Sequence, residues 1–206
     1  AIASILPKMS LRESVQTSKI YSVAGKGNPL RGLMKQRPFR APHYSVSMAA
    51  LLGGGSDTII PGEVSLASGG VLFLDELPEF PKSITDNLRQ PIEDRRVTIT
   101  RANGRVTFPC SFMLVGAMNP CRCGYFGHPT KPCTCHPGDV KRYISKISGP
   151  MLDRIDIQIE LPSLSYDELS ENSAPAESSA VIRERVAKAR RYALDRMGEQ
   201  SERKIW

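Results

Sequence analysis

The chain has 206 residues, with 28 lysine and arginine residues against 21 acidic residues and a formal net charge of +7. The composition excludes a transmembrane protein, a collagen and a disulfide-stapled mini-domain, because no apolar run spans a bilayer and 40% of the residues are hydrophobic. The positive charge predicts an anionic partner such as a nucleotide, a nucleic acid or an anionic lipid.

The first fifty residues predict short elements separated by turns. Residues 1–20 have the pattern of a helix tail followed by polar residues, with Pro7 ending the helix. Residues 21–45 are basic and rich in glycine and proline. Residues 46–52 predict a short helix that stops at the glycine triplet 53–55.

Two continuous apolar runs predict strands that are buried in a parallel sheet. Residues 71–74 form the first run, and residues 112–117 form the second. Residues 82–93 between them predict one helix, because apolar residues recur at every fourth position. The alternating apolar residues from Ile155 to Leu161 predict a third strand.

A β-hairpin is predicted over residues 97–108. Two β-branched runs flank Asn103-Gly104, and Asn-Gly favours a tight hairpin turn because both turn positions need positive φ. Further along, residues 163–178 have the composition of a linker. Residues 179–197 predict an amphipathic helix whose charged face is typical of ordinary solvent exposure.

Polar residues at the ends of the predicted strands are candidates for nucleotide chemistry. Asp75 and Glu76 follow the first strand, where a carboxylate can hold Mg²⁺ and its neighbour can orient a water molecule. Asn119 follows the second strand and could bond a phosphate. Arg154 precedes the third strand and could neutralise charge in a transition state.

Each of these residues also has a purely structural interpretation. The acidic pair could be an ordinary surface pair that ends a strand, and Asn119 could be a turn former before Pro120. Arg154 could form a salt bridge with Asp153 or Asp156.

Four of the five cysteines fall within fifteen positions and predict a zinc loop. They are spaced as C-x-C and C-x-C, and four thiolates suit tetrahedral zinc: Cys121, Cys123, Cys133 and Cys135. Free thiols on a loop are the alternative, and His128 or His136 could substitute as a ligand. Cys110 stands apart and predicts a buried apolar residue. A cysteine cluster without an export signal favours the cytoplasm.

Several motifs in order give the chain a resemblance to a known family. They are RPFRAPH, Pro61-Gly62-Glu63, VLFLDELPEF, LRQPIED, AMNPC and SGPMLDRIDI. Over about residues 20–162 this series resembles the magnesium chelatase-like AAA+ ATPases, most closely their bacterial ComM/YifB branch. The expected fold is therefore α/β, an AAA+ P-loop-type parallel sheet flanked by helices, with β-hairpin insertions and a candidate zinc loop.

The resemblance implies a role for each candidate residue. Asp75 and Glu76 match the Walker B pair, which would hold the Mg²⁺ of Mg-ATP and activate water. Asn119 matches sensor 1, and Arg154 matches the arginine finger that acts on ATP in an adjacent subunit of a ring, expected to be a hexamer. Residues 53–70 match the helix-2 insert region, and residues 97–108 match the pre-sensor 1 hairpin, which faces DNA in related helicases.

The sequence departs from the family in lacking a G-x-x-x-x-G-K-[ST] motif, which cradles phosphates. We therefore expect residues 1–162 to be a partial AAA+ core that starts after Walker A. Residues 179–206 would lead toward a C-terminal lid that is missing. Such a fragment would hydrolyse ATP poorly on its own, whereas its intact parent would be active.

The leading functional expectation is a motor that couples ATP hydrolysis to DNA remodelling or translocation. Arg96, Arg101 and Arg105 on the hairpin would contact phosphates, with a merely exposed charged hairpin as the alternative. One rival is the ATPase subunit of a magnesium chelatase that inserts Mg²⁺ into a porphyrin. Another is a non-catalytic, zinc-stabilised binding module.

Overall fold

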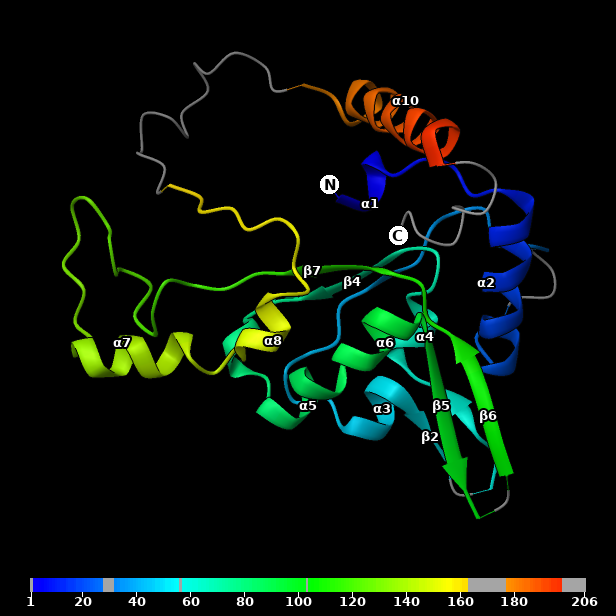
Figure 1. Ribbon diagram of the computed structural model, residues 1–206, viewed down its shortest axis with the longest axis horizontal. Coiled ribbons are helices and arrows are strands. Elements are labelled where there is room, and N and C mark those ends of the chain that lie inside the picture. Colours follow the sequence, from blue (N-terminus) through cyan, green and yellow to red (C-terminus); the bar gives the residue numbers. More distant parts are fainter. Residues whose placement is uncertain (1, 28–31, 56, 103, 163–176, 198–206) are drawn as a thin grey trace.

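A three-stranded parallel sheet forms the centre of the computed structural model, which describes residues 2–27, 32–55, 57–102, 104–162 and 177–197 (Figure 1). The strand order is β1 (Phe39–Arg40), β4 (Val71–Leu74) and β7 (Met113–Gly116). Val71 pairs with Phe39 on one side and with Met113 on the other. The predicted strand over residues 71–74 is confirmed, and its central place explains its continuous apolar run.

The two later strand predictions need correction. β7 lies within the predicted range of 112–117, but Met113, Leu114 and Val115 are only half-buried because β7 pairs with β4 alone among the described strands. The predicted strand from Ile155 to Leu161 is wrong, since these residues form no strand and Leu161 is 84% exposed. None of the described strands pairs with this segment, and an extended segment without a partner does not form a strand.

The predicted helix over residues 82–93 is two helices, α5 (Lys82–Asn87) and α6 (Arg89–Asp94). Pro91 lacks the N–H that would bond the Asn87 carbonyl, so the continuous helix breaks at Leu88. Leu88 and Ile84 still point into the core, as their spacing predicts. The 3₁₀ helix η2 (Leu77–Glu79) precedes α5.

The region of residues 46–70 folds into short elements beside the sheet. They are α3 (Met48–Leu52), a two-stranded antiparallel pair of β2 (Gly53–Gly54) and β3 (Ile60–Pro61), and α4 (Glu63–Leu66). Ser47 caps α3 by accepting a bond from the Ala50 N–H, and Gly53 ends it at a φ of 116°. The predicted helix and its glycine stop are confirmed, with a start two residues later than predicted.

The predicted hairpin is confirmed as β5 (Arg96–Arg101) and β6 (Gly104–Pro109). Val97, Ile99 and Phe108 point into the core, so the hairpin packs one face on the domain. Asn103 of the predicted turn lies outside the described residues.

Two further helices match the predicted set, and three were not predicted. α1 (Ile2–Ile5) matches the expected helix tail, but α2 (Leu11–Val23), α7 (Pro137–Ile144) and α8 (Gly149–Leu152) were not predicted. α10 (Ser179–Met197) confirms the amphipathic helix. The linker prediction falls on residues 163–178, of which 163–176 lie outside the described residues.

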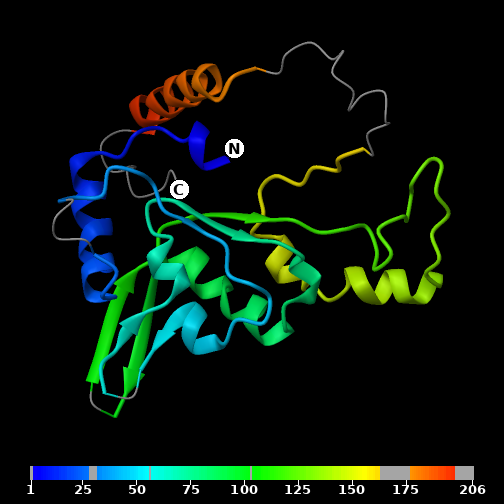
Figure 2. The ribbon, with the colours of Figure 1, turned by 180° about the vertical axis from the view of Figure 1, so that it is seen from behind.

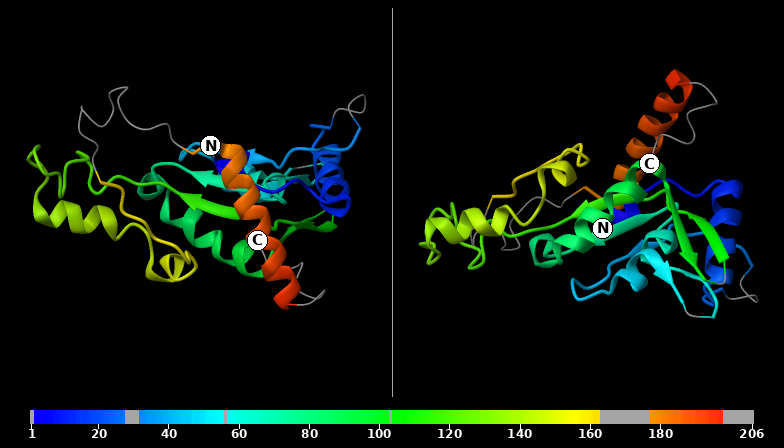
Figure 3. Two further views of the ribbon diagram at one scale, coloured as in Figure 1. Left: turned by 90° about the horizontal axis from the view of Figure 1, so that it is seen from above. Right: turned by 60° about the horizontal axis from the view of Figure 1, so that its bottom comes forward.

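The views agree on where the functional parts lie. α10 and α1 lie on the side of the sheet opposite α5 and α6 (Figures 1 and 2). The loop that carries the cysteines and α7 extends from one end of the molecule, and the β5–β6 hairpin extends from the other (Figures 1 and 3). In the described part of the chain, no helix is long and apolar enough to cross a membrane.

Candidate functional site

The carboxyl ends of β4 and β7 bring three of the predicted residues to one edge of the sheet. Asp75 and Glu76 come directly after β4, and Asn119 comes three residues after β7. The parallel register continues past the strands, because the Ala117 N–H donates to the Leu74 carbonyl at 2.9 Å. All three side chains are exposed, so this edge is open to a ligand.

The turn after β4 holds Glu76 in a left-handed backbone conformation, with φ 52° and ψ 43°. For a residue with a Cβ this conformation costs about 1–3 kcal/mol, so surrounding contacts must maintain it. The Glu76 N–H donates to Asp75 Oδ1 at 2.9 Å, and the Glu79 N–H donates to the Glu76 carbonyl at 2.7 Å. The Leu77 N–H donates to the Ala117 carbonyl at 2.9 Å, which ties the turn to the neighbouring strand.

Arg154 lies elsewhere and has an unexpected partner. It follows α8 and forms an ion pair with Glu93 of α6, so neither of the predicted partners Asp153 and Asp156 holds it. Its Nε is buried without a hydrogen-bond partner. Among the residues that the structure describes, no hydrogen bond or ion pair joins Arg154 to the three residues at the sheet edge.

The four clustered cysteines converge on one point. Their sulfur atoms all lie within 4.8 Å of one another, and the sulfurs of Cys121, Cys123 and Cys133 are 3.3, 3.5 and 3.7 Å apart. Zinc–sulfur bonds of about 2.3 Å in a tetrahedron place the sulfurs about 3.8 Å apart, so the cluster could hold zinc. His128 accepts backbone N–H bonds at its Nδ1, and His136 occupies the N-cap position of α7 without a capping bond from its side chain.

Backbone amides favour the thiolate form at one cysteine of this cluster. Bonds from the backbone of Tyr125 and then Thr134 lower the pKa of Cys123 to about 5. The Cys135 backbone would lower the pKa of Cys133 as well, but burial and the neighbouring thiols raise it to about 12. Several thiolates this close repel one another, and a divalent cation between them would remove that repulsion.

The three hairpin arginines do not form one cluster. Arg101 and Arg105 lie near the turn, where Arg101 pairs with Gly104 and Thr100 pairs with Arg105. Arg96 lies at the opposite end of the hairpin, paired with Pro109. All three side chains are exposed. A ligand at the hairpin tip would therefore meet two of the three predicted arginines.

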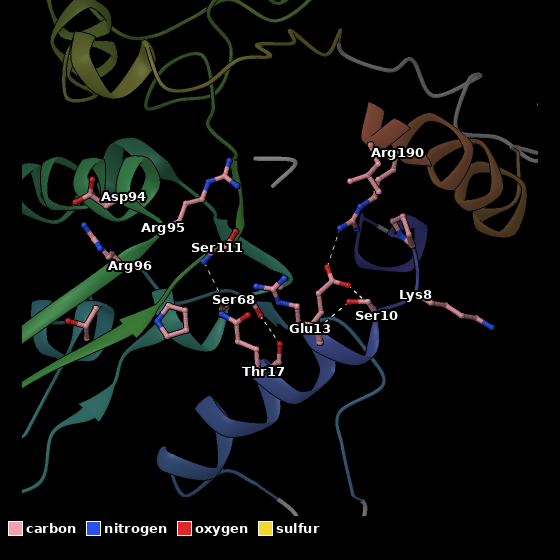
Figure 4. Close-up of a pocket in the computed structure, with 17 residues that line it drawn as sticks. Lys8, Ser10, Glu13, Thr17, Ser68, Asp94, Arg95, Arg96, Ser111 and Arg190 are labelled. Carbon is pink, nitrogen blue, oxygen red and sulfur yellow. Dashed lines mark hydrogen bonds and ion pairs between the residues drawn. The ribbon is translucent and has the colours of Figure 1, made fainter. Parts of the chain in front are cut away.

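A cavity of about 740 Å³ lies between α2, α10 and the base of the hairpin (Figure 4). It contains Arg96 but none of the predicted residues of the sheet edge. In Figure 4, Arg95 and Arg190 come from opposite sides of this space, from the hairpin base and from α10. Glu13 joins its walls by pairing with both Arg37 and Arg190.

Sequence reasoning missed two residues that lie beside the candidate edge, Tyr143 on α7 and Lys146 just after it. Lys146 Nζ contacts Glu79 Oε2 at 3.0 Å, and Tyr143 is buried next to Asn119. Pro137 at the helix start and Asp139 in the first turn are signals that could have predicted α7.

Comparisons with known proteins agree with the motif series. A family model described as "Magnesium chelatase, subunit ChlI" matches residues 1–169. Competence protein ComM of Haemophilus influenzae is 43% identical over 198 residues, which are 96% of this chain and 38% of that protein. The uncharacterized protein YifB of Escherichia coli is 40% identical over the same shares. The chain thus spans 38% of the length of these curated relatives.

Proposed function

This chain belongs to the magnesium chelatase-like ComM/YifB family, and we propose that it supplies the Mg²⁺-binding and water-activating edge of an AAA+ ATPase. The observation that carries the proposal is the placement of Asp75, Glu76 and Asn119 at adjacent strand ends, on an exposed edge of a parallel sheet. Ligands bind at this edge in open α/β sheets.

The residues at the edge fit a magnesium nucleotide. Mg²⁺ prefers one or two carboxylates together with phosphate oxygens, and when bound it neutralises charge on the phosphates. Asp75 would hold the ion, and Glu76 would orient a water molecule and accept its proton. The Asn119 amide would bond the terminal phosphate or the water beside it.

Arg154 would act on ATP in an adjacent subunit of a homo-oligomeric ring, which we propose to be a hexamer. In this chain its guanidinium pairs with Glu93 of α6. A neighbouring nucleotide would have to compete with Glu93 for the same guanidinium. The Walker A segment and the lid would come from the rest of the parent protein.

The experiment that tests this assignment is Glu76→Gln in the full-length protein. The amide cannot accept a proton, so we expect ATP turnover to fall by about 10²–10⁴-fold while the affinity for ATP stays within two-fold. Glu177→Gln, at an exposed position two residues before α10, is the matched control and should change neither quantity. Turnover that is unchanged in Glu76→Gln would remove Glu76 from the proposed role.

We propose further that the four clustered cysteines hold one structural zinc ion. All four positions of the tetrahedron would be taken by sulfur, which leaves no place for a substrate. The metal would therefore stabilise the loop between β7 and α7, and it would take no part in ATP hydrolysis as a Lewis acid.

The proposed work of the motor is DNA remodelling, supported by the exposed arginines at the hairpin tip and by the likeness to competence protein ComM. Contacts to phosphates release counterions, so Arg105→Ala in the full-length protein should weaken single-stranded DNA binding and make it less dependent on salt. Arg142→Ala, at the opposite end of the molecule, is the control. Equal binding by both variants would exclude the hairpin as the DNA contact.

Measurements of ATP hydrolysis and of ATP and zinc binding in the full-length protein distinguish the rival functions. ATP hydrolysis that single-stranded and branched DNA do not stimulate would favour a chelatase-type ATPase with a protein partner. A full-length protein that binds zinc but neither binds nor hydrolyses ATP would favour the non-catalytic binding module.

A further inference from the structure

The chain leaves the candidate edge at Asn119, passes through all four clustered cysteines, and returns to the same edge through α7. Cys121 lies two residues after Asn119, and Cys135 lies two residues before Pro137, the first residue of α7. The cysteine cluster thus joins the chain just after Asn119 to the chain just before α7.

Tyr143 is the contact through which α7 reaches the edge. Its side chain is only 5% exposed, and the neighbouring Cys121 is fully buried. Burial raises the pKa of the Tyr143 hydroxyl, and the negative charges of Glu79 and Glu76 raise it further, while the Asn119 backbone opposes this shift. The geometric link between the Tyr143 ring and the acidic turn after β4 is Lys146, which lies over the ring and contacts Glu79.

Lys146 provides a second contact to the same turn. Its Nζ lies 3.0 Å from Glu79 Oε2 and 5.7 Å from the centre of the Tyr143 ring. Glu79 ends η2 and donates its N–H to the Glu76 carbonyl, so holding Glu79 also holds the backbone of Glu76. The strained conformation of Glu76 needs such support.

We propose that the cysteine cluster, Tyr143 and Lys146 form a brace that positions Glu76 and Asn119, so that zinc at the cysteines controls the geometry of the ATPase edge. Tyr143 and Lys146 are positioning residues, because they act through Glu79 and through the Asn119 backbone. The catalytic consequence rests on the proposed ATPase function, whereas the structural coupling between metal and edge does not.

The chemistry of the two side chains distinguishes a brace from simple packing. A phenylalanine at position 143 would fill the same apolar space, so only the lost hydroxyl would separate it from tyrosine. The link between Lys146 and Glu79 depends on opposite charges, so exchanging the two charges should restore it.

The first test measures amide hydrogen exchange in the full-length protein, with zinc bound and after its removal by a chelator. We expect amides of residues 76–80 and 117–121 to exchange about five-fold faster or more without zinc, while those of β5 and β6 stay unchanged. Lys146→Met should accelerate residues 76–80 with zinc still bound, and Lys141→Met on the exposed face of α7 should not. Faster exchange confined to residues 121–135 after zinc removal would overturn the proposal.

The second test measures ATP hydrolysis in the same variants. Tyr143→Phe and Lys146→Glu should each lower kcat by about ten-fold, with KM for ATP, zinc content and Tm near those of the wild type. Combining Lys146→Glu with Glu79→Lys should restore most of the lost kcat. Unchanged kcat in the single variants, or no recovery in the double variant, would contradict a positioning role. A wild type without any turnover would refute the ATPase function, and hydrogen exchange would still decide the coupling.

Discussion

Glu13 holds the N-terminal part of the fold together, and replacing it by glutamine tests that role. Its carboxylate accepts bonds from Arg37 at 3.0 and 3.1 Å, from Arg190 at 3.2 Å and from the Ser10 N–H at 2.7 Å. It therefore joins the start of α2 to Arg37 before β1 and to α10 on the opposite side of the cavity (Figure 4).

The pKa of Glu13 gives the size of the expected effect. Burial alone would raise this pKa, but the bond from Arg37, the bond from Ser10 and the charges of both arginines lower it from 4.5 to about 2. That pKa difference corresponds to about 3 kcal/mol of free energy of unfolding if solvent screening is ignored. Because Glu13 is partly exposed, screening reduces this contribution to about 1–2 kcal/mol. Glutamine would also remove the negative charge of Glu13 from beside Arg37, whose side chain is 3% exposed, so we expect a total loss of about 2–3 kcal/mol.

Urea unfolding of this chain at several pH values measures the effect. A lowered carboxyl pKa adds stability that is complete above about pH 4.5 and is lost as the pH falls toward 2. The gap between the wild type and Glu13→Gln should therefore be largest at neutral pH and shrink below pH 4.5. Glu177→Gln, which loses only an exposed pair with Arg185, should cost less than about 0.5 kcal/mol. A Glu13→Gln gap that is equally small, or that does not change with pH, would refute this reasoning.

Two further predictions concern substitutions of Gly53 and Gly138 and the reactivity of Cys110. Gly53→Ala should destabilise the chain by about 1–3 kcal/mol, because the position has a φ of 116° and a new Cβ would lie 2.4 Å from Ile99 Cδ1. Gly138→Ala on α7 meets open space and should stabilise by about 0.5–1 kcal/mol, which urea unfolding would measure. Cys110 is buried, and burial raises its pKa to about 12, so mass spectrometry should find it unmodified by iodoacetamide in the folded chain and modified in urea. Rapid alkylation of Cys110 in the folded chain would contradict its burial.

Local sequence patterns correctly predicted the elements that depend on neighbouring residues alone. The hairpin follows from Asn103-Gly104 between β-branched runs, and β4 follows from four apolar residues between glycines and acids. α2 also had a local signal, the Ser10 and Glu13 capping box, which the structure forms with both of its bonds. Even so, no helix was predicted at this position from the sequence. The apolar residues of α2 form only a weak stripe, and polar contacts anchor the helix to the rest of the domain.

Features that depend on distant partners could not be predicted in this way. The alternation from Ile155 to Leu161 indicates a strand, but strand formation needs a neighbouring edge that a local pattern does not specify. The same holds for Arg154, whose partner Glu93 is far away in the sequence. The convergence of the four cysteines could be predicted because all of them lie in one short loop.

Ion pairs within the fold reduce the number of basic residues that could bind the anionic partner predicted from the net charge. Arg37 pairs with Glu13 and Arg40 pairs with Glu63, so these two basic residues serve the fold in this chain. Arg31 lies outside the described residues. The exposed tip of the hairpin is therefore a better candidate for an anionic partner than the basic stretch before β1.

The place of the hairpin in the chain suggests how a ligand at its tip would affect ATP chemistry. The chain runs from Glu76 through α5 and α6 into the hairpin, and from the hairpin through β7 to Asn119. The hairpin base is fixed, because the Cys110 N–H donates to the Arg95 carbonyl and the Met113 N–H donates to the Gly70 carbonyl, both at 2.9 Å. A displacement of this base would move β7 relative to β4, and hence Asn119 relative to Glu76. The proposed brace would transmit that displacement through Lys146 and Glu79 to the Glu76 backbone, so loosening it by Lys146→Met should weaken any stimulation of ATP turnover by DNA, as measured in the full-length protein. Stimulation that persists unchanged in Lys146→Met would show that the effect of DNA at the hairpin does not depend on the brace.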